Sequence, residues 1–390
     1  MFNKFLLLLS NLYILLFIFS FYNDNFVADH ILGESGFKVI FPLFWLFFAS
    51  AIFRNFKTTN TTQFKLIYAL FAYLFTLLLL ELLLDWNVTF APAGSALLAI
   101  ISMLIYFNRY SIDKALYFIW FAMMGSIVIC YFNQPLSEWT FRTSGGTEDP
   151  NEFATQLLAF LFGSIYLYLH NRSKTFLAVT VVFFTYGLFK AGSMTSFLIL
   201  GSLGLISLIR FLIIKPNYFF NAKALLLLFT LLIILTQIDF TKIEAIQNML
   251  GRTKNTDTAL FRMHSWIAGM HMTEAHPLIG VGGDAFAVNE PLYEEFHMVG
   301  SAPAPHNIYI KLIAESGIPA FLLFMTFLIY IIKVNFKTLF YQNEWFLFMS
   351  LLSILLMGLT LGILYDKYLW LSIALIMNLN YQLQQKGRKL

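Results

Sequence analysis

Residues 66–84 read LIYALFAYLFTLLLLELLL, an apolar run whose single charged residue is Glu81. About 20 apolar residues span the hydrocarbon core of a bilayer, so such a run is typical of a transmembrane helix. Similar runs recur at about 5–22, 39–53, 90–107, 115–132, 153–169, 176–189, 195–209, 224–238, 318–332, 345–365 and 368–383. All are continuously apolar and lack the alternation of a membrane β-barrel. The sequence therefore predicts an all-α polytopic membrane protein of about 12 transmembrane helices.

The composition of the chain indicates the same class. Of its 390 residues, 59% are hydrophobic and only 12% are charged, whereas a soluble domain carries roughly 25% charged residues. So much apolar surface cannot be buried in a soluble core. The composition therefore excludes a soluble enzyme, a nucleic-acid binder and a disordered scaffold. A single cysteine, Cys130, excludes an intramolecular disulfide.

The distribution of Lys and Arg predicts the orientation of the helices. If the N-terminus is cytoplasmic, 16 of the 25 basic residues fall in cytoplasmic segments, as the positive-inside rule requires. Both termini are then cytoplasmic, and the first run is a retained helix, since no cleavage site for a signal peptide follows it. The chain divides into helices one to nine (1–238), one large outer loop (239–317), and helices ten to twelve with a cytoplasmic tail (318–390).

The large loop contains an amphipathic helix in its middle. Asp257 or Thr258 can cap a helix that continues to Ala275 and is stopped by Pro277. An apolar stripe at helical spacing suits a helix that lies on the membrane surface. The stripe consists of Leu260, Met263, Ile267 and Met270.

The polar residues of this helix allow several interpretations. Arg262 and Trp266 share a neighbouring face at spacing i,i+4 and could bind an anionic substrate. Alternatively, Arg262 reaches out to a lipid head group. A metal site is less favoured, because the spacing matches no zinc motif. Its candidate ligands are His264, His271, Glu274 and His276.

The end of the large loop holds a second candidate site. His306 and Asn307 stand where a helix begins, and Asn307 is a natural cap. The free N–H groups there suit a phosphate or oxyanion, and His306 could act as a general base. Lys311 and Glu315 form an i,i+4 pair on the same helix. The alternative is a purely structural capping turn.

A third candidate lies in the outer loop 133–152. Asp149, Pro150 and Asn151 form a cap before the sixth run, and Gly145-Gly146 would let backbone amides approach a ligand. Three cations on the outer side are not required by topology and are functional candidates, although contacts to lipid head groups are equally open. They are Arg142, Lys190 and Arg262, which could converge on a pyrophosphate.

Taken together, these motifs resemble the O-antigen ligase and polymerase superfamily of bacterial envelope glycosyltransferases. The resemblance rests on Arg142…Gly145…Asp149-Pro150-Asn151, on Arg262-x-x-x-Trp266…His276-Pro277-Leu278-x-Gly280-Val281-Gly282, and on His306-Asn307…Glu315-x-Gly317-Ile318. It extends over the whole topology, with one large periplasmic loop. One departure is Ser193-Met194, where the family usually has Ser-Arg, and Lys190 is the candidate to supply that charge.

The resemblance implies an inverting glycosyltransferase of the bacterial inner membrane whose active site faces the periplasm. The donor would be a glycan on undecaprenyl pyrophosphate, and no cofactor, nucleotide or metal would be needed. Arg142, Arg262 and Lys190 would bind the pyrophosphate, and His306 would deprotonate the acceptor hydroxyl. Supporting roles would fall to Asn307, Glu315, Trp266, His276, Gly280, Gly282, Asp149 and Asn151. Trp139, Trp266 and Tyr309 could stack on sugar rings.

The identity of the acceptor stays open at this point. Ligation to lipid A–core, polymerisation of repeat units and transfer to protein share the same motifs, with a slight preference for the ligase. A transporter of lipid-linked glycans is the alternative from another class. Transporters place ionisable groups near the midplane, often in repeated halves. Here Glu81 is the main such residue and no repeat is visible, which favours chemistry at the outer face.

Overall fold

The computed structural model describes Ile18 and residues 61–83, 112–132, 143–145, 147, 149–214, 257–293, 305–341 and 344–387. This described part consists of helices and turns without strands, which confirms the all-α class. The helices are α4 (Thr61–Leu83), α6 (Ile112–Phe132), α7 (Pro150–Asn171), α8 (Lys174–Ala191), α9 (Met194–Ile214), α12 (Asp257–Ala275), α13 (Phe286–Tyr293), α14 (Ile308–Tyr341), α15 (Trp345–Met357), η4 (Ile363–Tyr365) and α16 (Lys367–Gly387).

Five of the described helices are long and apolar enough to cross a membrane: α6, α7, α8, α9 and α14. The chain is therefore a membrane protein, as predicted. The predicted runs 39–53, 90–107 and 224–238, and the run 5–22 apart from Ile18, lie outside the described residues. The count of twelve helices, the large loop and the three-part division accordingly stay predictions.

Two helices differ in extent from the runs that predicted them. Helix α14 begins at Ile308, well before the predicted run 318–332, and contains a kink at Gly317 (φ 79°, ψ 172°). The run 345–365 is not one helix, since α15 ends at Met357 and is followed by turns and η4. Hydropathy marks apolar side chains, and it does not report where a helix starts, bends or stops.

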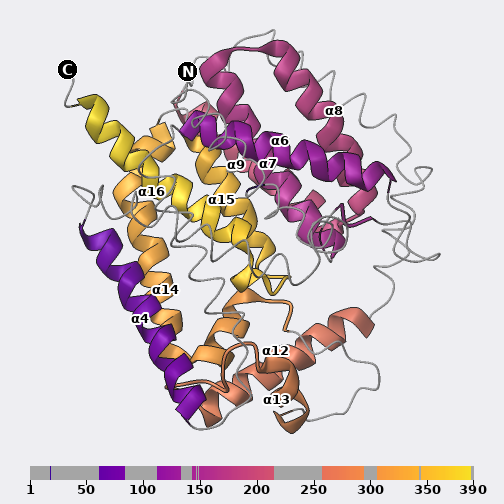
Figure 1. Cartoon of the computed structure of the whole chain (residues 1–390). Coiled ribbons are helices and arrows are strands. Elements are labelled where there is room, and N and C mark those ends of the chain that lie inside the picture. The colour runs from indigo at the N-terminus through magenta and orange to yellow at the C-terminus, as the bar shows by residue number, and fades with distance from the viewer. Residues whose placement is uncertain are drawn as a thin grey trace, which may run out of the picture.

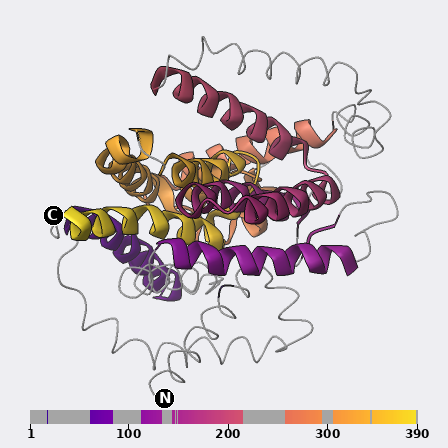
Figure 2. The ribbon, with the colours of Figure 1, turned by 90° about the horizontal axis from the view of Figure 1, so that it is seen from above.

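The helices form a bundle with α12 and α13 at one end. In Figure 1, α12 and α13 lie together at the lower end of the molecule, beside α14. Seen from above, α6, α7 and α16 extend across the molecule in similar directions (Figure 2). The core contains fully buried aromatic residues such as Phe153, Phe324 and Phe327.

Local capping signals explain where α7 begins and ends. Asp149 is the N-cap, its side chain accepts a hydrogen bond from the N–H of Asn151 (2.5 Å), and Pro150 occupies the first turn. Helix α7 ends at Arg172 in a left-handed conformation (φ 58°). The predicted Asp-Pro-Asn cap is therefore confirmed, and it places Asp149 at an end of the bundle.

Candidate active site

Two motifs that lie far apart in the sequence form one joint in the structure. The turn 277–282 lies against residues 314–318 of α14, and we call this contact the glycine joint. Three backbone hydrogen bonds close it: Val281 N–H to Ala314 O (2.9 Å), Gly282 N–H to Glu315 O (3.1 Å) and Ile318 N–H to Pro277 O (2.8 Å). The H-P-L-x-G-V-G and E-x-G-I motifs are thus two sides of a single structural unit.

The kink in α14 explains why this joint is needed. In an uninterrupted helix, the carbonyls of Ala314 and Glu315 would accept hydrogen bonds from residues 318 and 319. Pro319 has no N–H, and the kink at Gly317 turns the Ile318 N–H to Pro277 instead. Since unpaired buried backbone groups are costly, the turn 277–282 supplies the partners that α14 itself lacks.

Both glycines of the joint are required by close backbone contact. A Cβ on Gly280 (φ +69°) would lie 2.3 Å from the carbonyl carbon and oxygen of Glu315. A Cβ on Gly317 (φ +79°) would lie 2.3 Å from the carbonyl oxygen of Leu278. The same Leu278 carbonyl accepts a hydrogen bond from the Tyr73 hydroxyl, which connects the joint to α4.

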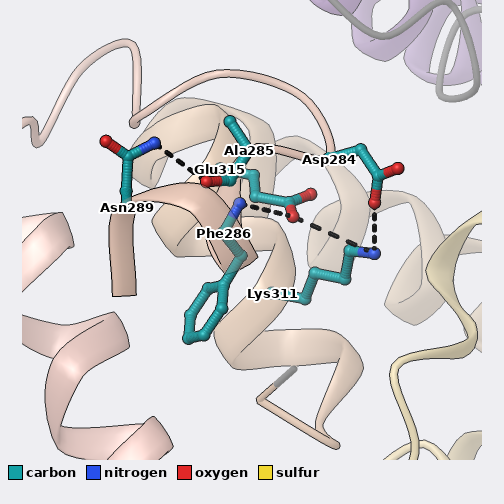
Figure 3. A network of polar contacts seen from close by, with 6 residues as sticks. All are labelled: Asp284, Ala285, Phe286, Asn289, Lys311 and Glu315. Atoms are coloured by element: carbon teal, nitrogen blue, oxygen red, sulfur yellow. Dashed lines mark hydrogen bonds and ion pairs between the residues drawn. The ribbon is translucent and has the colours of Figure 1, made fainter. Parts of the chain in front are cut away.

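A buried charged network strengthens the joint (Figure 3). Glu315 is fully buried, and its carboxylate accepts a hydrogen bond from the N–H of Phe286 (3.4 Å), the first residue of α13. Lys311 lies 3.9 Å from the same carboxylate and donates to Asp284 at 3.0 Å. Asp284 has a left-handed backbone (φ 57°). The predicted Lys311–Glu315 pair is confirmed, and it connects α14 to the start of α13.

His306 precedes the first turn of α14. Asn307 caps the helix, since its side-chain oxygen accepts from the N–H groups of Tyr309 (2.9 Å) and Ile310 (3.2 Å). The predicted cap is therefore confirmed. His306 is half-buried and has a left-handed backbone with φ 43°.

The charges near His306 come from two other helices. Burial lowers the pKa of His306 below its ordinary value of 6.5, the cation Arg262 on α12 lowers it further, and Asp149 at the start of α7 raises it. At neutral pH the imidazole is therefore uncharged and can accept a proton. Among the described residues, no carboxylate lies within ion-pair distance of Arg262. The structure thus brings a free base, a cation and Asp149 close together.

Lys190 lies at the end of α8, next to the described part of the loop that follows Arg142. Its carbonyl accepts a hydrogen bond from the N–H of Thr143 (3.1 Å), which is the neighbour of Arg142 in the sequence, and its own side chain is exposed. A Cβ on Gly145 would lie 2.7 Å from the ring of Phe153, so this glycine is required by packing. Arg142 itself, Gly146 and Trp139 lie outside the described residues.

Two of the histidines considered as metal ligands contact Tyr293 instead. His276 Nε2 lies 2.9 Å from the Tyr293 hydroxyl, and His271 Nδ1 lies 3.2 Å from the Tyr293 carbonyl oxygen. Ser265 on α12 donates to the buried Glu290 of α13. These polar contacts hold α13 against α12.

The structure places α12 at its predicted position. The helix spans Asp257–Ala275 and is followed by a turn that contains Pro277. Three members of the predicted apolar stripe, Leu260, Met263 and Met270, are 44–48% exposed. Exposed apolar residues on one face suit the predicted contact with a membrane surface, which stays a prediction.

Residues 158–325 match the family model for O-antigen ligase. The match confirms the resemblance to the O-antigen ligase and polymerase superfamily, and it points in general to a glycosyltransferase-like enzyme. The O-antigen ligase region contains both sides of the glycine joint, Arg262, His306 and Lys190, whereas Arg142 and Asp149 precede it. No curated protein matches the chain.

Three contacts of the O-antigen ligase region have no counterpart in the sequence prediction. The Trp266 indole N–H donates to the Pro305 carbonyl oxygen (2.7 Å), which gives this residue a role other than sugar stacking. The others are the ion pair of Asp284 with Lys311 and the hydrogen bond from Tyr73 to the turn. The position of Asp284 directly after Gly282-Gly283 is the one sequence feature that could have pointed to the ion pair.

Proposed function

We propose that the chain is an O-antigen ligase-like membrane glycosyltransferase. It transfers a glycan from undecaprenyl pyrophosphate to an acceptor hydroxyl of lipid A–core at the periplasmic face of the bacterial inner membrane. The observation that carries this proposal is the hydrogen bond from Trp266 to the Pro305 carbonyl (2.7 Å), which places Arg262, one helical turn earlier on α12, near His306 at the capped start of α14. A base for the acceptor and a cation for the leaving group are the two groups that this transfer requires.

In the proposed reaction, His306 takes the proton of the acceptor hydroxyl as the oxygen attacks the anomeric carbon. The bond between that carbon and the pyrophosphate oxygen breaks, and undecaprenyl pyrophosphate leaves with the bonding electrons. Attack from the opposite face inverts the anomeric centre. Arg262, with Arg142 and Lys190, stabilises the negative charge that develops on the leaving group. The mechanism uses no metal and no cofactor.

The residues around the reacting groups then have supporting roles. Asn307 caps the start of α14, Glu315 fixes the start of α13 against α14, and Gly280 and Gly282 belong to the glycine joint. Asp149, whose charge acts on His306, would stabilise the imidazolium that forms when the proton is taken. His276 holds Tyr293 and so supports α13.

A repeat-unit polymerase of the same superfamily is the second candidate, since it uses the same donor and leaving group. A transporter of lipid-linked glycans is less favoured, because the sequence shows no internal repeat and the buried charged network of Asp284, Lys311 and Glu315 lies between α14 and the start of α13. Deletion of the gene distinguishes ligase from polymerase. Unligated long chains on the lipid carrier indicate a ligase, and single repeats on the core indicate a polymerase.

The direct test uses purified protein in liposomes with a lipid-linked donor. We expect release of undecaprenyl pyrophosphate only when an acceptor is present. The variants Arg262→Ala and His306→Ala should abolish release and still insert and fold. Near-normal turnover in both variants would contradict the site. Reporter fusions that place 239–317 in the cytoplasm would contradict the periplasmic location.

A further inference from the structure

His306 has a backbone conformation that its own side chain does not favour. Its φ of 43° lies in the left-handed region, where a residue with a Cβ is strained. Such a conformation persists only when contacts of the surrounding structure hold it in place. The contacts of the two neighbouring residues therefore decide where the imidazole points.

On the C-terminal side of His306, the backbone is fixed by contacts within α14 and with the turn after α15. Asn307 caps α14, and its side-chain amide donates to the Leu359 carbonyl oxygen (3.3 Å). The N–H of Ile308 donates to the Gly358 carbonyl oxygen (2.8 Å). This side of His306 is fixed by the helix cap and by a neighbouring segment.

On the N-terminal side of His306, one hydrogen bond among the described residues fixes the backbone, and its donor lies on α12. The Trp266 indole N–H donates to the Pro305 carbonyl at 2.7 Å. That carbonyl belongs to the peptide bond that enters His306, so its direction is coupled to the φ of His306. Trp266 stands one helical turn after Arg262. The helix that carries the cation therefore also holds the base.

We infer that Trp266 is a positioning residue that keeps His306 at a fixed location relative to Arg262. This inference rests on the proposed function, because it concerns the base and the cation of the proposed transfer. A displacement of about 1 Å between reacting groups can lower the rate about 100-fold. One indole hydrogen bond at this place consequently controls turnover without contact to the reacting atoms.

The test removes the indole N–H and keeps an aromatic ring, in Trp266→Phe. The matched control is Trp345→Phe, which loses an equivalent hydrogen bond, from Nε1 to Ser207 Oγ (3.0 Å), on α15. We expect kcat of the first variant to fall about 10- to 100-fold with KM within about twofold, and the control to keep both values. If Trp266→Phe does not fold, benzothienylalanine at this position keeps the shape of the indole and lacks only the donor.

A second measurement works without turnover. Diethyl pyrocarbonate modifies neutral imidazole, and mass spectrometry resolves the rate at His306 as a function of pH. The charged groups that face His306 are Arg262 and Asp149. In Trp266→Phe, solvent reaches the imidazole more easily, so we expect faster modification and a midpoint at higher pH than in the parent protein and in Trp345→Phe.

The two measurements separate the inference from the proposed function. If the parent protein turns over none of the donors, but Trp266→Phe changes the modification of His306, then the proposed function fails. The result would still support the inference that Trp266 positions His306. If the protein is active and Trp266→Phe leaves kcat unchanged, the inference is overturned. Unchanged modification of His306 in Trp266→Phe also overturns it.

Discussion

Replacement of Gly280 by alanine tests whether the glycine joint holds the site together. The new Cβ would lie 2.3 Å from the Glu315 carbonyl, at a φ of +69°. The left-handed conformation costs an alanine about 1–2 kcal/mol. Relief of the overlap separates the turn from α14 and breaks the hydrogen bonds to Ala314 and Glu315, each of which contributes about 0.5–1.5 kcal/mol. We expect Gly280→Ala to lower the free energy of unfolding by about 2–5 kcal/mol.

The matched control is Gly204→Ala, in the middle of α9. A Cβ on Gly204 meets no atom of the described residues within 4 Å, and alanine is favoured over glycine inside a helix by roughly 0.5–1 kcal/mol. This control should therefore be as stable as the parent protein or slightly more stable. Equilibrium unfolding in mixed micelles, followed by near-UV circular dichroism, measures both variants.

The result that would refute the reasoning is a Gly280→Ala protein as stable as Gly204→Ala. It would mean that the turn 277–282 and α14 separate without cost, and the joint could not then fix Arg262 relative to His306. A large loss of stability in both variants would instead indicate that the bundle tolerates no added methyl group, and the effect at Gly280 would not be specific to the joint.

The remaining predictions concern charge. Since burial and then Arg262 lower the pKa of His306, its base form persists below pH 6.5, and the acid limb of the pH–rate profile should lie below that value. Asp149 raises this pKa, so Asp149→Asn should move the acid limb to lower pH. Arg262 lowers it, so Arg262→Gln should raise the pH at which His306 is modified by diethyl pyrocarbonate. Shifts of the two variants in the same direction would contradict the assignment. Lys311→Met leaves the buried Glu315 without its cation and should cost about 3–5 kcal/mol in unfolding experiments, and the double variant with Glu315→Gln should recover part of this loss.

Local sequence signals predicted local structure well. Helix α12 extends over the predicted residues because Pro277 stops it. The caps at Asp149 and Asn307 follow from short polar side chains that accept hydrogen bonds from N–H groups two or three residues later. The Lys311–Glu315 pair follows from helical spacing. In each case the interacting residues are close in the sequence.

Contacts between distant segments could not be predicted in this way. The sequence shows that Gly280 lies in a tight turn, but not that the turn lies against the carbonyl of Glu315. It shows an aromatic residue at position 266, and it offers no reason to pair an indole N–H with Pro305. The end of α15 at Met357 depends in the same way on the neighbouring start of α14, because the Gly358 carbonyl accepts from Ile308. Such partners are set by tertiary structure.

The glycine joint gives a physical reason why the H-P-L-x-G-V-G and E-x-G-I motifs occur together in one chain. A base and a cation that act on opposite sides of a breaking bond must keep their separation through the reaction. Long side chains such as arginine are flexible, so a fixed separation has to come from the backbones that carry them. Here the backbone hydrogen bonds of the joint hold the end of α12 against α14, and Trp266 holds the peptide that enters His306. Because these contacts involve main-chain atoms and the Trp266 indole, they leave the side chains of Arg262 and His306 available for a substrate.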